Sequence, residues 1–75
     1  MTIKSFINYI EKINKELRET LSLDVELIPL CLKNNIAIAS GKNARYVTNT
    51  LLKLKKIEDF CEIKRMGRKA FVIKF

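Results

Sequence analysis

The fold of this chain depends on residues 25–40, which read VELIPLCLKNNIAIAS. The stretch is apolar towards both ends, contains Pro29 and has a polar centre at residues 33–35. A helix capped by Asp24 would carry Pro29 beyond its first turn, where the ring removes a hydrogen bond and kinks the chain. Two strands would instead alternate their side chains across a hairpin whose turn is the polar centre. The pattern leaves both structures open, and the fold depends on which one forms.

The segment before this stretch has the period of an amphipathic helix, with apolar residues at alternating spacings of three and four. This spacing predicts a helix over residues 2–21. The same spacing is typical of a short two-stranded coiled coil, so the stripe can pack on its own domain or form the interface with a second copy or a partner protein. The stripe consists of Ile3, Phe6, Ile10, Ile13 and Leu17.

A second helix is predicted after Gly41, over residues 44–57, because Val47, Leu51 and Leu54 return at helical spacing. Ser40 or Asn43 can cap its start. The opposite face is polar and basic, and offers the residue types that read base edges and contact phosphates in the major groove of DNA. These candidate binding residues are Lys42, Asn43, Arg45, Tyr46, Asn49, Lys53 and Lys56.

The last stretch, residues 60–75, alternates as a pair of strands around a turn near Gly67. Phe71, Ile73 and Phe75 share one face, and Cys61 and Ile63 join them if the loop holds an odd number of residues. The turn is strongly basic. Its candidate nucleic-acid-binding residues are Lys64, Arg65, Arg68 and Lys69.

Charge is distributed unevenly along the chain. The 75 residues, enough for one domain, carry a formal net charge of +7. Residues 1–32 hold four basic and five acidic groups, a net charge of −1, whereas residues 33–75 hold eleven basic and three acidic groups, a net charge of +8. This favours a polyanionic partner, above all nucleic acid, for the second half of the chain.

Several functions find no support in the residue inventory. With no His, and with Cys31 and Cys61 far apart, neither a zinc site nor a paired nucleophile and base is expected. The two cysteines are expected to be buried and reduced, with a single disulfide as the alternative. We therefore expect a non-catalytic protein with no cofactor and no metal. The longest apolar runs are too short for a membrane span, and the N-terminus has no apolar leader, so we expect a cytoplasmic protein with no membrane partner.

Residues 36–47, continuing through Leu51 and Leu54, resemble the helix-turn-helix core of winged-helix DNA-binding domains. Ala37 stands at the small position of the first helix, Gly41 at the turn and Val47 in the recognition helix. The resemblance covers residues 34–75 and implies an α+β winged-helix domain, in which residues 44–57 enter the major groove and the basic hairpin is the wing. It implies a transcription regulator that binds duplex DNA.

A second architecture remains open: helix, hairpin, helix, hairpin, giving one antiparallel sheet with two helices on one face. In it, residues 36–44 are distantly similar to the basic strand-Gly-helix turn of Alba-type archaeal chromatin proteins, which also implies nucleic-acid binding. The alternative function is an accessory subunit that binds protein within a replication, transcription or ribosomal complex, docking through the stripe of the first helix. The sequence does not separate DNA from RNA.

Overall fold

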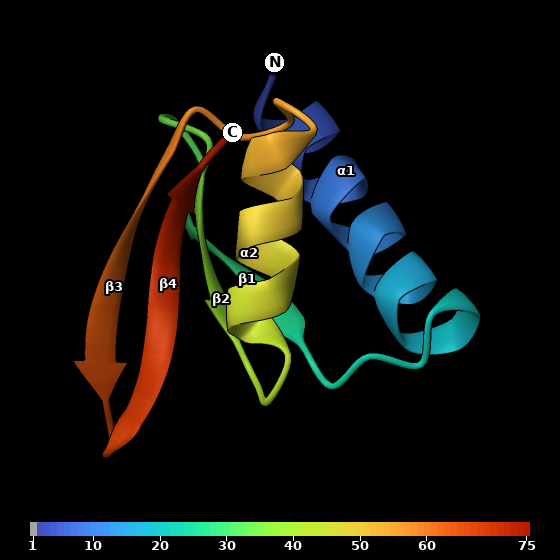
Figure 1. Ribbon diagram of the computed structural model, residues 1–75. Coiled ribbons are helices and arrows are strands. Elements are labelled where there is room, and N and C mark those ends of the chain that lie inside the picture. Colours follow the sequence, from blue (N-terminus) through green and yellow to red (C-terminus); the bar gives the residue numbers. More distant parts are fainter. Residues whose placement is uncertain (1) are drawn as a thin grey trace.

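The computed structural model describes residues 2–75 as two helical segments on one face of a four-stranded antiparallel sheet (Figure 1). The α+β class is confirmed, and the order of elements is that of the second architecture, helix, hairpin, helix, hairpin. In chain order the elements are α1 (Ile3–Lys15), the π-helical turn η1 (Glu16–Thr20), β1 (Glu26–Cys31), β2 (Ile36–Ser40), α2 (Ala44–Lys53), β3 (Asp59–Arg65) and β4 (Arg68–Lys74).

Residues 25–40 form the hairpin β1–β2, with Leu27 opposite Ala39. The helix expected before Gly41 by the helix-turn-helix resemblance is therefore absent, and residues 36–40 are a strand instead. Pro29 fits because β1 is an edge strand, and the pairing becomes irregular just after it. Ala37 and Ala39 are fully buried in the core, where small side chains allow the helices to lie close to β2.

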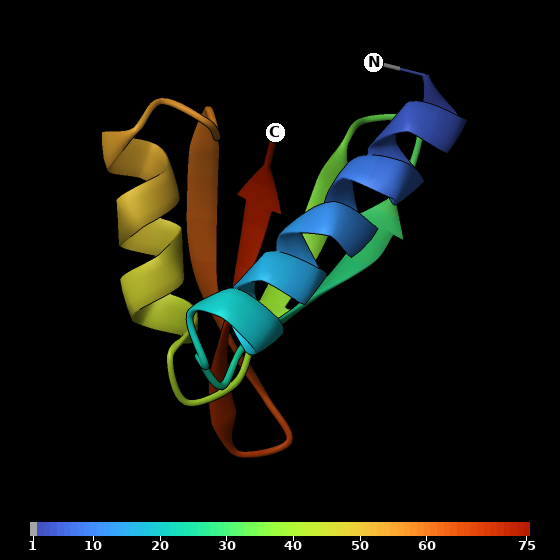
Figure 2. The same ribbon diagram turned by 90° about the vertical axis from the view of Figure 1, so that its right-hand side faces the viewer.

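The order of strands across the sheet is β1-β2-β4-β3, so β2 and β4 are central and β1 and β3 are edges. Helix α1 packs on β1, and α2 packs on β4 and β2. Figure 2 shows both helices on the same side of the sheet, with α1 crossing the β1–β2 half. Among residues 2–75, no helix covers the other face of the sheet, which is therefore its open face.

The core lies between the helices and the sheet and explains the role of the first helix. Phe6 and Ile10 are 0% and 1% exposed, and Leu17 is also buried. Of the two uses predicted for the stripe, these three residues show packing on their own domain; the alternative, an interface with a partner, is wrong for them because their side chains are buried in the core. Ile13 packs against the core while partly buried, and Ile3 is exposed.

The helix ends differ modestly from those predicted. Thr2 caps α1 by accepting a hydrogen bond from the Ser5 backbone N–H (3.1 Å), and helical structure continues through η1 to Thr20, close to the expected end. Helix α2 ends at Lys53 rather than at residue 57, because Lys55 adopts a left-handed backbone (φ 58°) that turns the chain. Ile57 still reaches the core, from outside the helix.

The C-terminal hairpin is confirmed, and its turn holds two residues, Met66 and Gly67, between the paired Arg65 and Arg68. With this even number, Phe60 pairs with Ile73 and lies on the helix side. Cys61 and Ile63 therefore face the open side of the sheet. The expectation that both cysteines are buried is wrong, because Cys61 is exposed there; both thiols are free.

Among residues 2–75, no helix combines the length and the apolar character that crossing a bilayer requires.

Candidate nucleic-acid interface

The tip of the β3–β4 hairpin extends beyond both helices at one end of the molecule (Figure 1). Met66 and Gly67 both have positive φ (51° and 79°), the backbone of a tight two-residue hairpin turn. The Met66 side chain is 95% exposed, so nothing in the described chain covers the turn. The four basic residues predicted from the sequence flank this turn: Lys64, Arg65, Arg68 and Lys69.

These four cations are arranged as two pairs on opposite faces of the hairpin. Arg65 lies directly opposite Arg68 on the open face, and Lys64 lies directly opposite Lys69 on the helix side. Like charges in directly opposite positions destabilise a hairpin. Within residues 2–75, no carboxylate lies within 4.0 Å of Lys64, Arg65 or Arg68. The tip is therefore a concentration of positive charge that the fold itself does not need.

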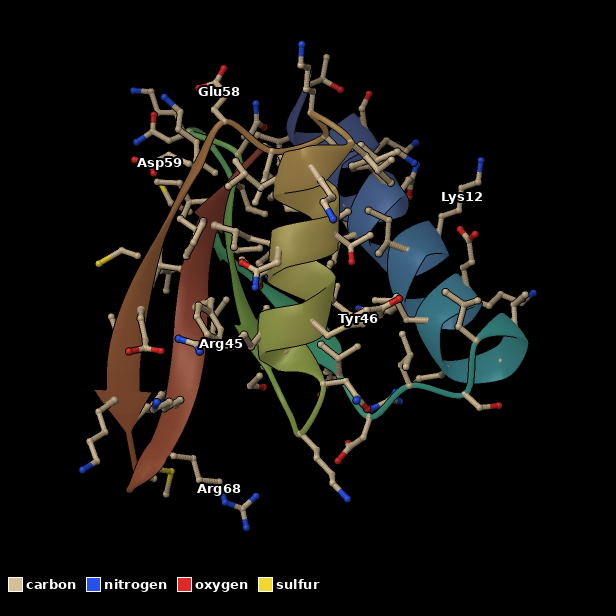
Figure 3. All side chains as sticks on the ribbon, in the orientation of Figure 1. Lys12, Arg45, Tyr46, Glu58, Asp59 and Arg68 are labelled. Carbon is tan, nitrogen blue, oxygen red and sulfur yellow. The ribbon has the colours of Figure 1, made fainter. Side chains whose placement is uncertain are left out.

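One carboxylate lies near the base of this tip. Glu62 accepts a hydrogen bond from the Arg45 guanidinium (3.4 Å) and lies 3.9 Å from the Lys69 ammonium. Figure 3 shows Arg45 reaching from α2 across to the β3–β4 hairpin. Arg45 was predicted on the outward face of the second helix, and the structure instead places it beside the hairpin, where it shares Glu62 with Lys69.

A groove of about 960 Å³ lies beside the tip, between the hairpin and the loops that precede β1 and α2. Its floor includes Ile28, Ile38 and Ala70 from the open face of the sheet. Its carboxylates already have partners, since Glu26 lies 3.7 Å from Arg18 and Asp24 accepts the Lys42 backbone N–H (3.4 Å). The basic residues that line it are Arg18, Lys42, Arg65, Arg68 and Lys69. The groove thus joins Lys42 to the hairpin cations in one positively charged surface.

Asn43, a predicted binding residue, has a structural role. Its side-chain oxygen accepts the Asp24 backbone N–H (2.8 Å), and its own N–H donates to the Asp24 carbonyl (2.9 Å). Gly41 makes this contact feasible, because a Cβ there would stand 2.5 Å from the Asp24 carbonyl oxygen, at a φ of +124°. Asn43 therefore joins the loop before β1 to the loop before α2, and its side-chain oxygen already has a hydrogen-bond partner.

The remaining predicted residues lie on or after α2, away from the tip. Lys53 is the last residue of α2 and Lys56 follows it; this end of the helix lies opposite the hairpin turn (Figure 1). Tyr46 lies on the side of α2 that faces α1 (Figure 3), and Asn49 is exposed on the helix. The eleven predicted residues do not form one continuous surface: the structure brings together only Lys42, Arg45 and the four residues of the hairpin.

Arg18 is a functional candidate that sequence analysis missed. It lies in η1, within a half of the chain that has no excess of positive charge, and only the folded arrangement places it at the groove. Its guanidinium is 61% exposed and paired with Glu26. No local pattern in the sequence could have identified it.

Comparison of the chain with models of protein families, with curated proteins and with solved structures gives no match. The function must therefore be inferred from the chemistry of the surface. Arginine presents planar pairs of N–H donors that fit phosphate oxygens, and lysine adds a mobile point charge. Five such cations around one groove and one protruding turn form a surface suited to a chain of phosphates.

Proposed function

We propose that this protein binds nucleic acid, with duplex DNA as the first candidate, without catalysing a reaction on it. The single observation that carries the proposal is the pair Arg65 and Arg68, side by side at an exposed turn with no carboxylate within 4.0 Å among residues 2–75. Such a pair is costly to a hairpin in isolation and favourable beside phosphates. The net charge of +7 would assist the encounter.

In this proposal the hairpin contacts the phosphate backbone, the role that the winged-helix resemblance gives it, although residues 36–40 are a strand rather than the first helix of that motif. A two-stranded ribbon is also narrow enough to enter the major groove of B-DNA. Lys42 extends the contact from the hairpin along the groove wall. Helix α2 has a smaller part than the resemblance implies, because its N-terminal Arg45 lies near the hairpin while Lys53 lies at the far end. Phosphate contacts position a protein without reading sequence, so we expect low sequence specificity.

The test is fluorescence anisotropy with a labelled duplex of about 20 base pairs, titrated at several salt concentrations. The variant is Arg65→Ala/Arg68→Ala. Its matched control is Lys4→Ala/Lys12→Ala, which removes the same charge from the exposed surface of α1. We expect the hairpin variant to bind at least about tenfold more weakly, and the control to stay within about twofold of the wild type.

Equal losses in the two variants would mean that only net charge matters and would contradict a hairpin site. Single-stranded DNA and duplex RNA are titrated in parallel, and the tightest of the three ligands identifies the form of nucleic acid. Loss of binding to all three in the hairpin variant supports the proposal in its general form.

A protein-binding accessory role is the second candidate, and one observation favours it. An apolar groove of about 160 Å³ lies between the end of α1 and α2, bordered by the exposed Leu21, Tyr46 and Leu54. Exposed apolar residues around a groove are typical of protein-binding surfaces. Size-exclusion chromatography with and without duplex DNA separates the two functions. A chain that ignores DNA even at low salt would favour the accessory role.

A further inference from the structure

The two edges of the sheet differ in how far they are closed to another strand. At β1, the Asn14 side chain binds both the N–H and the carbonyl of Leu27 (2.8 and 2.9 Å), as a neighbouring strand would. Two residues further on, Pro29 has no N–H, and the pairing of β1 with β2 shifts between Pro29 and Cys31. Proline, irregular pairing and side-chain cover all protect an edge against further strands. The β1 edge is therefore closed.

The β3 edge lacks two of these protections, proline and irregular pairing, and only its first outward N–H is covered by a side chain. Its seven residues pair with β4 in one unbroken register, and it contains no proline. The Phe60 N–H is directed away from β4, because it binds the Asp59 carboxylate (2.8 Å). By the alternation of an antiparallel ladder, the N–H groups of Glu62 and Lys64 also point outward. No side chain among residues 2–75 accepts a hydrogen bond from either of them.

We propose that β3 is an interaction surface for a second copy of this chain, and that two β3 strands pair antiparallel to join both sheets into one. The register places Glu62 of both copies opposite each other at the two-fold axis. Asp59 then lies opposite the partner's Arg65, and Cys61 opposite the partner's Ile63. All seven residues of the strand are paired in this register. The inference does not depend on nucleic-acid binding.

The charges of β3 favour its own copy as the partner. The strand reads DFCEIKR, with an acid at its start and a base at its end, so antiparallel pairing brings opposite charges together twice. A strand with another order of charges would not place opposite charges at both ends of β3, which gives the edge its specificity. The two Glu62 carboxylates at the axis are tolerated because each already has Arg45 and Lys69 beside it.

Hydrogen bonding and apolar contact agree with the same register. The Phe60 N–H would pass from Asp59 to the carbonyl of the partner's Lys64, which releases the Asp59 carboxylate for the partner's Arg65. On the open face, the exposed Cys61 and the half-buried Ile63 would meet the same two residues of the other copy. The Arg68 side chain stays outside the joined strands and remains free for phosphate, whereas Lys69 stays beside Glu62 and Arg65 faces the partner's Asp59.

A charge-exchange series tests the pairing by sedimentation equilibrium. We expect the wild type to dimerise with rising concentration, and Asp59→Arg and Arg65→Asp each to raise the dimer dissociation constant about tenfold, because each places like charges opposite at two positions. The exchange variant Asp59→Arg/Arg65→Asp should restore the wild-type constant. Glu11→Arg and Lys12→Asp change net charge by the same amounts on exposed α1 and should leave it unchanged.

A wild type that stays monomeric up to its solubility limit would overturn the proposal. So would an exchange variant that dimerises no more strongly than the two single variants. Circular dichroism first establishes that each variant is folded. If duplex binding is lost in the exchange variant while dimerisation is restored, the dimer stands independently of the nucleic-acid site. Failure of the wild type to bind DNA would leave the dimer result equally decisive.

Cysteine crosslinking tests the register itself. In Cys31→Ser/Ile63→Cys, mild oxidation should link Cys61 of one copy to the introduced cysteine of the other, since directly opposite side chains lie close enough for a disulfide. The variants Cys31→Ser and Cys31→Ser/Cys61→Ser/Ile63→Cys should remain uncrosslinked. A link between the two Cys61 residues in Cys31→Ser would indicate a register shifted by two residues in one direction. A link between the two introduced cysteines in Cys31→Ser/Cys61→Ser/Ile63→Cys would indicate a shift by two residues in the other direction. Either result would contradict the proposed register.

Discussion

Asn14 binds both backbone polar groups of Leu27, donating from its side-chain amide to the carbonyl (2.9 Å) and accepting from the N–H (2.8 Å). The two residues come from α1 and β1, thirteen positions apart. One amide side chain thus satisfies a strand edge and attaches the first helix to the sheet. Leu27 is 1% exposed, so water could not easily replace these bonds.

We expect Asn14→Ala to lower the free energy of unfolding by about 2 kcal/mol, because it leaves two partly buried backbone groups without partners. Urea denaturation followed by circular dichroism measures the change. Asn8→Ala is the matched control, since Asn8 is exposed on the same helix and its side chain makes no hydrogen bond within residues 2–75. Its stability should change by less than about 0.5 kcal/mol. Equal effects would show that the Leu27 contact is unimportant.

Gly41→Ala should destabilise the fold by more than about 2 kcal/mol, since it combines a strained positive φ with a steric clash. The added Cβ would stand 2.5 Å from the Asp24 carbonyl oxygen, which is backbone and cannot rotate away. Gly67→Ala is the comparison, because φ there is +79° with no heavy atom within 4 Å of the added Cβ. It should cost about 1 kcal/mol, from backbone conformation alone. Thermal unfolding of both variants separates clash from conformation.

The parts of the fold that depend on local pattern could be predicted from the sequence. The stripe of the first helix, the start of the second and the C-terminal hairpin are each set by residues close together in the chain. Residues 25–40 could not be assigned, because their apolar run suits a helix or two strands equally. The choice is made by distant contacts: β2 pairs with β4, more than thirty residues later, with Ala37 opposite Ile73. The alanines of β2 also have to be small, because the helices pack over the sheet. This requirement depends on the tertiary structure and is not visible in the local sequence.

The candidate site also contains residues that could be predicted from the sequence and residues that could not. The hairpin cations are neighbours in sequence, so their gathering at one turn could be predicted. The role of the basic face of α2 could not be predicted, because its residues contact distant parts of the chain: Asn43 binds Asp24, and Arg45 binds Glu62. Periodicity identifies which residues share a helix face without revealing what lies across from it. Arg18 entered the groove only through the placement of η1 beside the sheet.

Glu62→Gln should strengthen nucleic-acid binding about two- to fivefold, since it removes the acidic group nearest the hairpin tip and frees Arg45 and Lys69 for phosphate. Stability should hardly change, because Glu62 is 41% exposed and exposed ion pairs contribute little. Anisotropy at two salt concentrations measures the affinity. Glu58→Gln makes the same change beside Lys74, beyond the opposite end of β3, and should have a weaker effect. An equal gain in both variants would point to net charge rather than to a local site.

Thr48→Val should stabilise the protein by about 1 kcal/mol. Thr48 is fully buried on the inner face of α2, and its hydroxyl has no hydrogen-bond partner among residues 2–75. Valine has the same shape and a similar helix propensity, so the exchange removes a buried unsatisfied group without opening a cavity. Thr50→Val is the control, because the Thr50 hydroxyl donates to the Tyr46 carbonyl (2.8 Å) at a half-buried position, and no gain is expected. Chemical denaturation of both variants makes the comparison. A loss of stability in Thr48→Val would mean that the buried hydroxyl has a partner in solution.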